Sequence, residues 1–116
     1  MSVLKTILVI LVALEFFYIM YLETLATQSA KTSQVFGMSQ EKLGQKEIDT
    51  LFKNQGIYNG LIGLGLLYGL IFNTSIILPI LLYIILVAAY GAYSSNPKIL
   101  LMQGGLAIIT AILYLF

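Results

Sequence analysis

The chain has 116 residues, of which 59% are hydrophobic and only 9% are charged. Soluble domains carry about 25% charged residues, so this composition excludes an ordinary water-exposed surface and indicates a membrane protein. The net charge of +1 comes from six lysines and five acids, without the basic clusters that nucleic-acid binders show, so we expect no nucleic-acid partner. Cysteine and histidine are absent, which excludes thiol chemistry, disulfides and Cys/His metal sites. We therefore expect neither a metal nor a cofactor.

Four apolar segments cover most of the chain, at residues 3–22, 55–72, 76–93 and 99–116. Each has about 18–20 residues and, as a helix rising about 1.5 Å per residue, matches the ~30 Å hydrocarbon core of a bilayer. The pattern predicts an all-α, polytopic membrane protein. We expect residues 1–116 to form a single transmembrane domain, a bundle of four transmembrane helices within the lipid bilayer.

The one long polar stretch, residues 24–54, joins the first two predicted spans. Ser39 is a suitable N-cap for a short amphipathic helix running from Gln40 toward Phe52. Its mixed charges are typical of a solvated helix at the membrane interface. We expect this stretch to be an interfacial loop containing that helix.

The lysines are unevenly divided between the two sides of a four-span chain. Lys5 lies at the start of the first span, whereas the loops at residues 24–54 and 94–98 fall together on the other side and carry the other five: Lys31, Lys42, Lys46, Lys53 and Lys98. Cytoplasmic loops of membrane proteins carry the excess of positive charge. We therefore expect both loops to be cytoplasmic and both termini to lie outside.

Glu15 is a carboxyl group inside the first apolar segment. An ionisable side chain at that depth costs at least ~2.5 kcal/mol, and such residues usually face a protein interior and mark a functional site. A purely structural role is the weaker interpretation, because glutamine would form similar hydrogen bonds without an ionisable group. We expect Glu15 to be a proton-linked site. A buried carboxyl group needs partners, and those available to it are Asn59, Gln103, Tyr18 and Tyr90.

Other polar side chains fall in the loop-side half of the predicted bundle. Glu23 lies about 12 Å above Glu15 at 1.5 Å per residue, and the remaining helices begin or end on the same side. Amide and phenol groups also commonly bridge membrane helices, which is the structural interpretation of the same residues. The candidate ligand- or proton-binding residues are Glu15, Glu23, Gln55, Asn59, Tyr18, Tyr90 and Gln103.

Small residues recur in the predicted spans, above all in the second. The spacing of Gly56 and Gly60 permits close approach of two helices, within the bundle or, alternatively, across a homodimer seam. The candidate helix-packing glycines are Gly56, Gly60, Gly63, Gly91, Gly104 and Gly105.

Five short stretches occur in order along the chain: ALEFFYIMYLE (13–23), VFG (35–37), NQGIYNG (54–60), AAYGAY (88–93) and ILLMQGG (99–105). With them the chain resembles a family of small bacterial four-helix membrane proteins catalogued as domain of unknown function 1304. The resemblance implies a place in the bacterial cytoplasmic membrane and supplies no activity. It puts these residues at family motif positions: Glu15, Glu23, Asn54, Gln55, Gly56, Asn59, Gly60, Tyr90, Gly91, Gln103, Gly104 and Gly105.

Three functions fit these residues. The first is binding or transport of a small amphipathic or cationic ligand in a polar pocket on the loop side, with Glu15 proton-linked and tyrosines suited to cations. The second is an intramembrane enzyme, isomerase-like, acting on a lipid or isoprenoid, although the ~12 Å between Glu15 and Glu23 argues against their acting on one atom. The third is a non-catalytic accessory subunit, in which the polar residues hold helices together. The sequence leaves open whether the chain is an enzyme.

Overall fold

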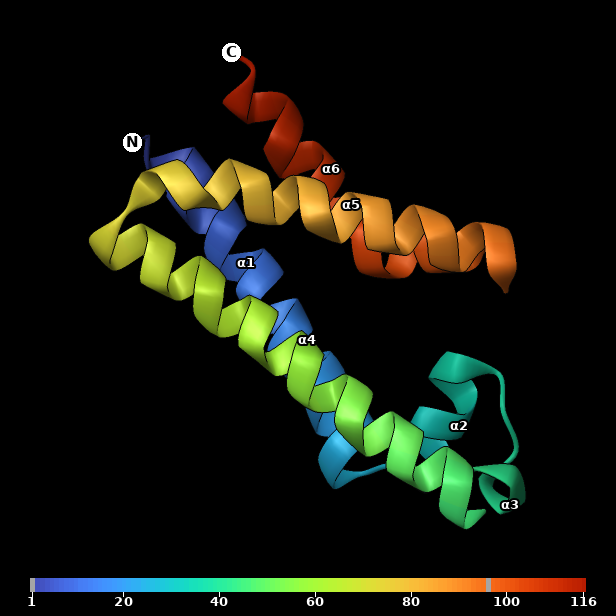
Figure 1. Ribbon diagram of the computed structural model, residues 1–116. Helices are drawn as coiled ribbons and strands as arrows, with labels where there is room; N and C mark the ends of the chain where they lie inside the picture. Colours follow the sequence, from blue (N-terminus) through green and yellow to red (C-terminus); the bar gives the residue numbers. More distant parts are fainter. Residues whose placement is uncertain (1, 96) are drawn as a thin grey trace. The chain divides into compact units, whose positions relative to one another are not determined.

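The computed structural model describes residues 2–95 and 97–116, and these residues are almost entirely helical, with no strand among them. The prediction of an all-α fold is confirmed. In chain order the elements are α1 (Val3–Met20), the π-helical segment η1 (Tyr21–Leu25), α2 (Ala30–Phe36), α3 (Gln40–Leu43), α4 (Lys46–Phe72), the short 3-10 turn η2 (Thr74–Ile76), α5 (Ile77–Ser94) and α6 (Lys98–Tyr114) (Figure 1).

Three of the described helical segments are long and apolar enough to cross a membrane: Val3–Leu25, Lys46–Phe72 and Thr74–Ser94. Less than a third of the most apolar part of each segment is buried, and many apolar side chains on these helices are exposed, as expected of surfaces that meet lipid. The fourth apolar helix, Lys98–Tyr114, has 17 residues and is shorter than the others. The chain is therefore an all-helical protein with three candidate membrane-spanning helices.

The second predicted span begins well before its predicted start. Helix α4 starts at Lys46 rather than near residue 55. Within its polar first turns, Lys53 forms an ion pair with Asp49, which lies one turn earlier on the same helix. Apolarity marks where a helix enters lipid, whereas backbone hydrogen bonding begins earlier. The expected boundary was wrong for that reason.

The predicted interfacial helix is divided in two. Ser39 accepts a hydrogen bond from the Lys42 backbone amide at 3.1 Å, which confirms its role as an N-cap. Helix α3 nevertheless ends at Leu43, and the next amides, of Gly44 and Gln45, bond to the carbonyls of Glu41 and Lys42 at the three-residue step of a 3-10 turn. The helix expected to reach Phe52 was therefore wrong, since residues from Lys46 onward belong to α4.

The described chain divides into two compact units. The contiguous unit is Phe16–Leu61, which holds η1, α2, α3 and the first part of α4. The discontinuous unit joins the residues up to Glu15 with Ile62–Phe116.

Within the discontinuous unit, α5 and α6 run side by side in opposite directions (Figure 1). Glycine permits their close approach, since a methyl group added at Gly104 would lie 3.2 Å from Cβ of Ala88. Leu81 and Ile84 are buried in the same packing. At the ends of the chain, the Lys5 ammonium lies 5.2 Å from the ring centre of Tyr114.

Within the contiguous unit, α2 ends at Gly37, whose φ of 65° is the left-handed conformation that glycine adopts most easily at a helix end. The turn directs Phe36 onto Phe52 of α4, edge to face, with ring centres 5.2 Å apart. Leu22 and Leu43 of the same unit are buried. The contact between Phe36 and Phe52 holds the segment between η1 and α4 against α4 itself.

Candidate carboxylate site

Glu23 is the most deeply buried of the acidic side chains, with no exposed surface. Its Oε1 accepts a hydrogen bond from Nδ2 of Asn59 at 2.6 Å, whereas Oε2 is buried and has no hydrogen-bond partner among the described residues. A buried polar atom without a partner is costly, so it is typical of a position that binds something. One oxygen of Glu23 is therefore positioned by the protein and the other is free to accept a donor or a cation.

Glu23 lies in the middle of η1, the π-helical end of the first candidate span. The Ala26 amide bonds to the carbonyl of Tyr21 at 2.9 Å, a five-residue step in place of the usual four. Such a turn accommodates one extra residue and occurs frequently at functional sites. The widened turn sets the direction in which the Glu23 side chain leaves the helix.

Two buried threonines satisfy the carbonyl groups at this helix end. The Thr27 hydroxyl donates to the Glu23 carbonyl at 2.7 Å. The hydroxyl of Thr32, which is fully buried, lies 2.7 Å from the Ala26 carbonyl and 3.1 Å from that of Leu22. The last carbonyls of a helix have no partner within it, so these hydroxyls take the place of the missing amides. Helix α2, which carries Thr32, is thereby tied to the end of η1.

Two glycines bring α4 close to this carboxyl group. A methyl group at Gly56 would collide with the Thr24 hydroxyl, and one at Gly60 would collide with the Met20 sulfur. The Thr24 hydroxyl also donates to the Lys53 carbonyl at 3.0 Å, which ties η1 to α4 directly. Both glycines are buried, and larger residues there would push Asn59 away from Glu23.

The donor set around Glu23 is poor in metal ligands. Among the described residues no three of His, Cys, Asp and Glu lie together in a way that could hold a metal ion. Glu23 and the amide of Asn59 supply oxygen and nitrogen groups suited to a proton, an ammonium group or another small cation, and to neutral hydrogen-bonding groups.

Glu15, which belongs to the discontinuous unit, resembles Glu23 in having one buried carboxyl oxygen without a partner among the described residues. Its side chain is half-buried, and its Oε1 is buried without a hydrogen-bond partner among the described residues. The partners expected within this unit do not reach that oxygen: Tyr90 is 70% exposed, and Gln103 is half-buried.

The remaining predicted residues lie as follows. Gln55 is exposed, and Tyr18 is about half exposed and stacked against Tyr21, with ring centres 6.5 Å apart. Asn59, expected as a partner of Glu15, donates instead to Glu23. Gly63 is buried, Gly91 packs against Ile99, and a methyl group at Gly105 would meet nothing within 4 Å.

The two threonines at this helix end were not predicted from the sequence. Ser29 caps α2 by accepting from the Thr32 amide at 3.1 Å, and a serine three residues before a threonine in a polar stretch is a recognisable capping signal. The π-helical turn has no comparable signal in the sequence.

Comparisons with known proteins show the family of this chain. A family described as "Protein of unknown function (DUF1304)" matches residues 10–115. The chain is 60% identical over 115 residues to "Uncharacterized protein YpaA" of Lactococcus lactis subsp. lactis (strain IL1403), and the match covers 97% of each chain. No solved structure matches this chain. With nearly its whole length matched, the chain belongs to the DUF1304 family, as its sequence motifs predict.

Proposed function

We propose that this protein binds, and carries across or within the membrane, a small cationic or amphipathic ligand at the carboxyl groups of its first span. The observation that carries the proposal is Oε2 of Glu23, a fully buried oxygen without a partner beside an oxygen that Asn59 holds. An ammonium or other small cation would satisfy that oxygen directly, and a proton would do so when the ligand is absent.

Glu15 is the proton-linked group of this proposal. Its buried and unpartnered Oε1 supports the idea, since a carboxyl group in an apolar helix without a partner has little structural use. Glu23 binds the ligand from the lysine-bearing side, and Glu15 exchanges a proton in step with that binding.

The proposal includes four membrane-spanning helices, with α6 as the fourth. At about 1.5 Å per residue α6 is somewhat shorter than the hydrocarbon core, which a small thinning of the bilayer accommodates. Both termini then lie outside, and residues 24–54 and 94–98 are cytoplasmic. The lysine distribution supports this orientation.

The absence of cysteine makes the orientation straightforward to test. Single cysteines at Ser2, Lys42 and Phe116 are labelled in intact cells with a membrane-impermeant maleimide. We expect labelling at positions 2 and 116 and none at position 42 until the cells are opened. Labelling of position 2 without position 116 would mean three spans and would contradict the four-helix arrangement.

The binding proposal is tested with dicyclohexylcarbodiimide, which modifies carboxyl groups in apolar surroundings, followed by mass spectrometry of the purified chain. We expect Glu15 and Glu23 to be modified, and the lipophilic cation tetraphenylphosphonium to protect Glu23. Glu47→Gln, which removes an exposed acid of α4, is the matched control and leaves protection unchanged. Unprotected Glu23, together with a Glu23→Gln variant that binds the cation as well as the original chain, would leave the accessory-subunit interpretation in its place.

A further inference from the structure

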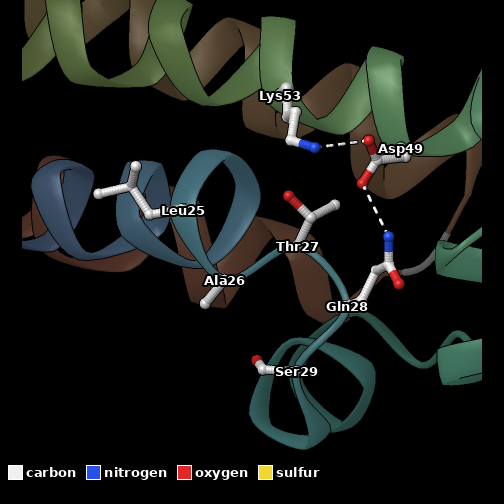
Figure 2. A pocket seen from close by; sticks show the side chains of 7 residues that line it. All are labelled: Leu25, Ala26, Thr27, Gln28, Ser29, Asp49 and Lys53. Carbon is white, nitrogen blue, oxygen red and sulfur yellow. Dashed lines mark hydrogen bonds and ion pairs between the residues drawn. The ribbon is translucent and has the colours of Figure 1, made fainter.

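A pocket of about 330 Å³ opens beside the carboxylate site, between the turn that follows η1 and the early turns of α4 (Figure 2). One wall is formed by residues 26–29, and the opposite wall by Asp49 and Lys53. Leu25, which is 73% exposed, forms the apolar edge. A volume of this size falls in the range of small-molecule sites.

The polar wall holds a lysine in a fixed position. Asp49 accepts from Nζ of Lys53 at 2.6 Å and from Nε2 of Gln28 at 3.3 Å, as Figure 2 shows. An ammonium group has three N–H donors, and Asp49 takes one of them. The Lys53 side chain is about half exposed, so its remaining donors are open to an acceptor in the pocket.

The backbone at Lys53 is also held. Its carbonyl accepts from the Thr24 hydroxyl at 3.0 Å, which fixes this turn of α4 against η1. The lysine therefore occupies a defined place relative to Leu25 and Gln28, unlike a lysine at a free helix end.

The position along the chain sets the depth of the pocket. Lys53 is the last charged residue before the long apolar part of α4, and Leu25 is the last residue of the first candidate span. Both spans thus reach their polar ends here, which is the level at which lipid headgroups lie. Asp49 balances the charge of Lys53, but the ammonium keeps N–H donors for a phosphate oxygen, and with the exposed leucine this suits a molecule with an anionic head and an apolar tail.

We propose that this pocket binds the headgroup of an anionic phospholipid, with the phosphodiester on Lys53 and Gln28 and the first methylenes of an acyl chain along Leu25. The pocket is separate from Glu23, and the proposal does not depend on the cationic ligand. A lysine near the membrane surface contributes about fivefold in affinity for anionic lipid. The bound lipid would hold the polar end of both spans at the membrane surface.

The test uses the full chain, purified in dodecyl maltoside and freed of lipid. Thermal unfolding is followed by circular dichroism during titration with dioleoylphosphatidylglycerol, dioleoylphosphatidylcholine or glycerol 3-phosphate, and native mass spectrometry counts the bound lipids. We expect phosphatidylglycerol to raise the unfolding temperature and to bind one molecule, because a ligand of the folded state stabilises it. Phosphatidylcholine and glycerol 3-phosphate should have much smaller effects.

Lys53→Gln should lower the affinity for phosphatidylglycerol about fivefold. Lys53→Arg, which keeps the charge, should retain most of the affinity. Lys46→Gln removes an exposed lysine of the same helix outside this pocket and should leave the affinity within about twofold.

Three results would overturn the proposal. Equal loss in the Lys46→Gln and Lys53→Gln variants would mean general surface attraction. Equal stabilisation by phosphatidylcholine would remove the role of the anionic head. A glycerol 3-phosphate effect as large as that of the lipid would assign the pocket to a soluble phosphate compound.

Discussion

Asn59 donates a hydrogen bond from Nδ2 to Oε1 of Glu23 at 2.6 Å, although the two residues are 36 positions apart in the sequence. The bond joins the end of the first candidate span, Val3–Leu25, to the second, Lys46–Phe72, although residues 26–45 lie between them in the sequence. Removing the donor of this bond is costly, because no water reaches the buried carboxyl group to replace the lost hydrogen bond.

Replacing Asn59 with leucine should therefore destabilise the protein. We expect a loss of about 1–3 kcal/mol in the free energy of unfolding, because Oε1 of Glu23 then joins Oε2 as a buried atom without a partner. Unfolding in sodium dodecyl sulfate, followed by circular dichroism, measures the loss. The double variant Glu23→Met/Asn59→Leu should be less destabilised than Asn59→Leu alone, and a loss equal to the sum of the single variants would contradict the coupling.

Thr32 should be a positioning residue for Glu23. Removing its hydroxyl in Thr32→Val takes a donor from the carbonyls of Leu22 and Ala26, of which Ala26 keeps the Ser29 amide, and this costs about 1–3 kcal/mol. The π-helical turn should then open, and hydrogen exchange of the amides in residues 21–26 should accelerate. Thr32→Ser keeps the hydroxyl and should restore slow exchange.

The matched control for this variant is Thr110→Val. Thr110 is also fully buried, but its hydroxyl donates at 2.7 Å to the Leu106 carbonyl within its own helix. This variant should leave exchange in residues 21–26 unchanged. If both valine variants accelerate exchange there to the same extent, Thr32 has no special role at η1.

Gly56 should not tolerate a side chain. Alanine there would collide with the Thr24 hydroxyl, which is itself held by the Lys53 carbonyl, so we expect a loss of about 1–3 kcal/mol from overpacking. Gly105→Ala is the comparison, because its methyl group would meet nothing within 4 Å and should stabilise the helix by ~0.5–1 kcal/mol. Unfolding curves for the two variants that coincide would mean that α4 does not approach η1 closely.

Glu15→Met should separate stability from activity. Methionine removes a buried oxygen that has no partner, so the free energy of unfolding should rise by about 0.5–2 kcal/mol. The same variant should lose the proton release that accompanies binding of tetraphenylphosphonium, measured with a pH dye in weakly buffered solution. A loss of stability on this substitution would mean that Glu15 is a structural residue.

The long apolar helices could be predicted because an apolar run of this length marks a helix. The segments around residues 3–22, 55–72, 76–93 and 99–116 all fall on helices, and Ser39 caps a helix as expected. The start of α4 could not be read in this way, since its first turns are polar and are bound by an ion pair rather than by burial.

The partners of the carboxyl groups were harder to predict. Counting residues at an even helical spacing from Glu15 to Glu23 passes through η1, where the wider turn changes the direction of every later side chain. Asn59 was expected near Glu15 from its estimated depth along its own helix, whereas it bonds to Glu23. The hydroxyl of Thr32 lies beyond the helix in sequence, and no periodic pattern could place it on the Leu22 and Ala26 carbonyls.

The contiguous unit has a consequence for the order of synthesis. Phe16–Leu61 is one continuous segment of the chain. The other unit is complete only when Ile62–Phe116 packs with the residues that precede Phe16. A growing chain folds its N-terminal units first. The residues of the Glu23–Asn59 bond therefore leave the ribosome ahead of α5 and α6, so this bond can form before the discontinuous unit is complete.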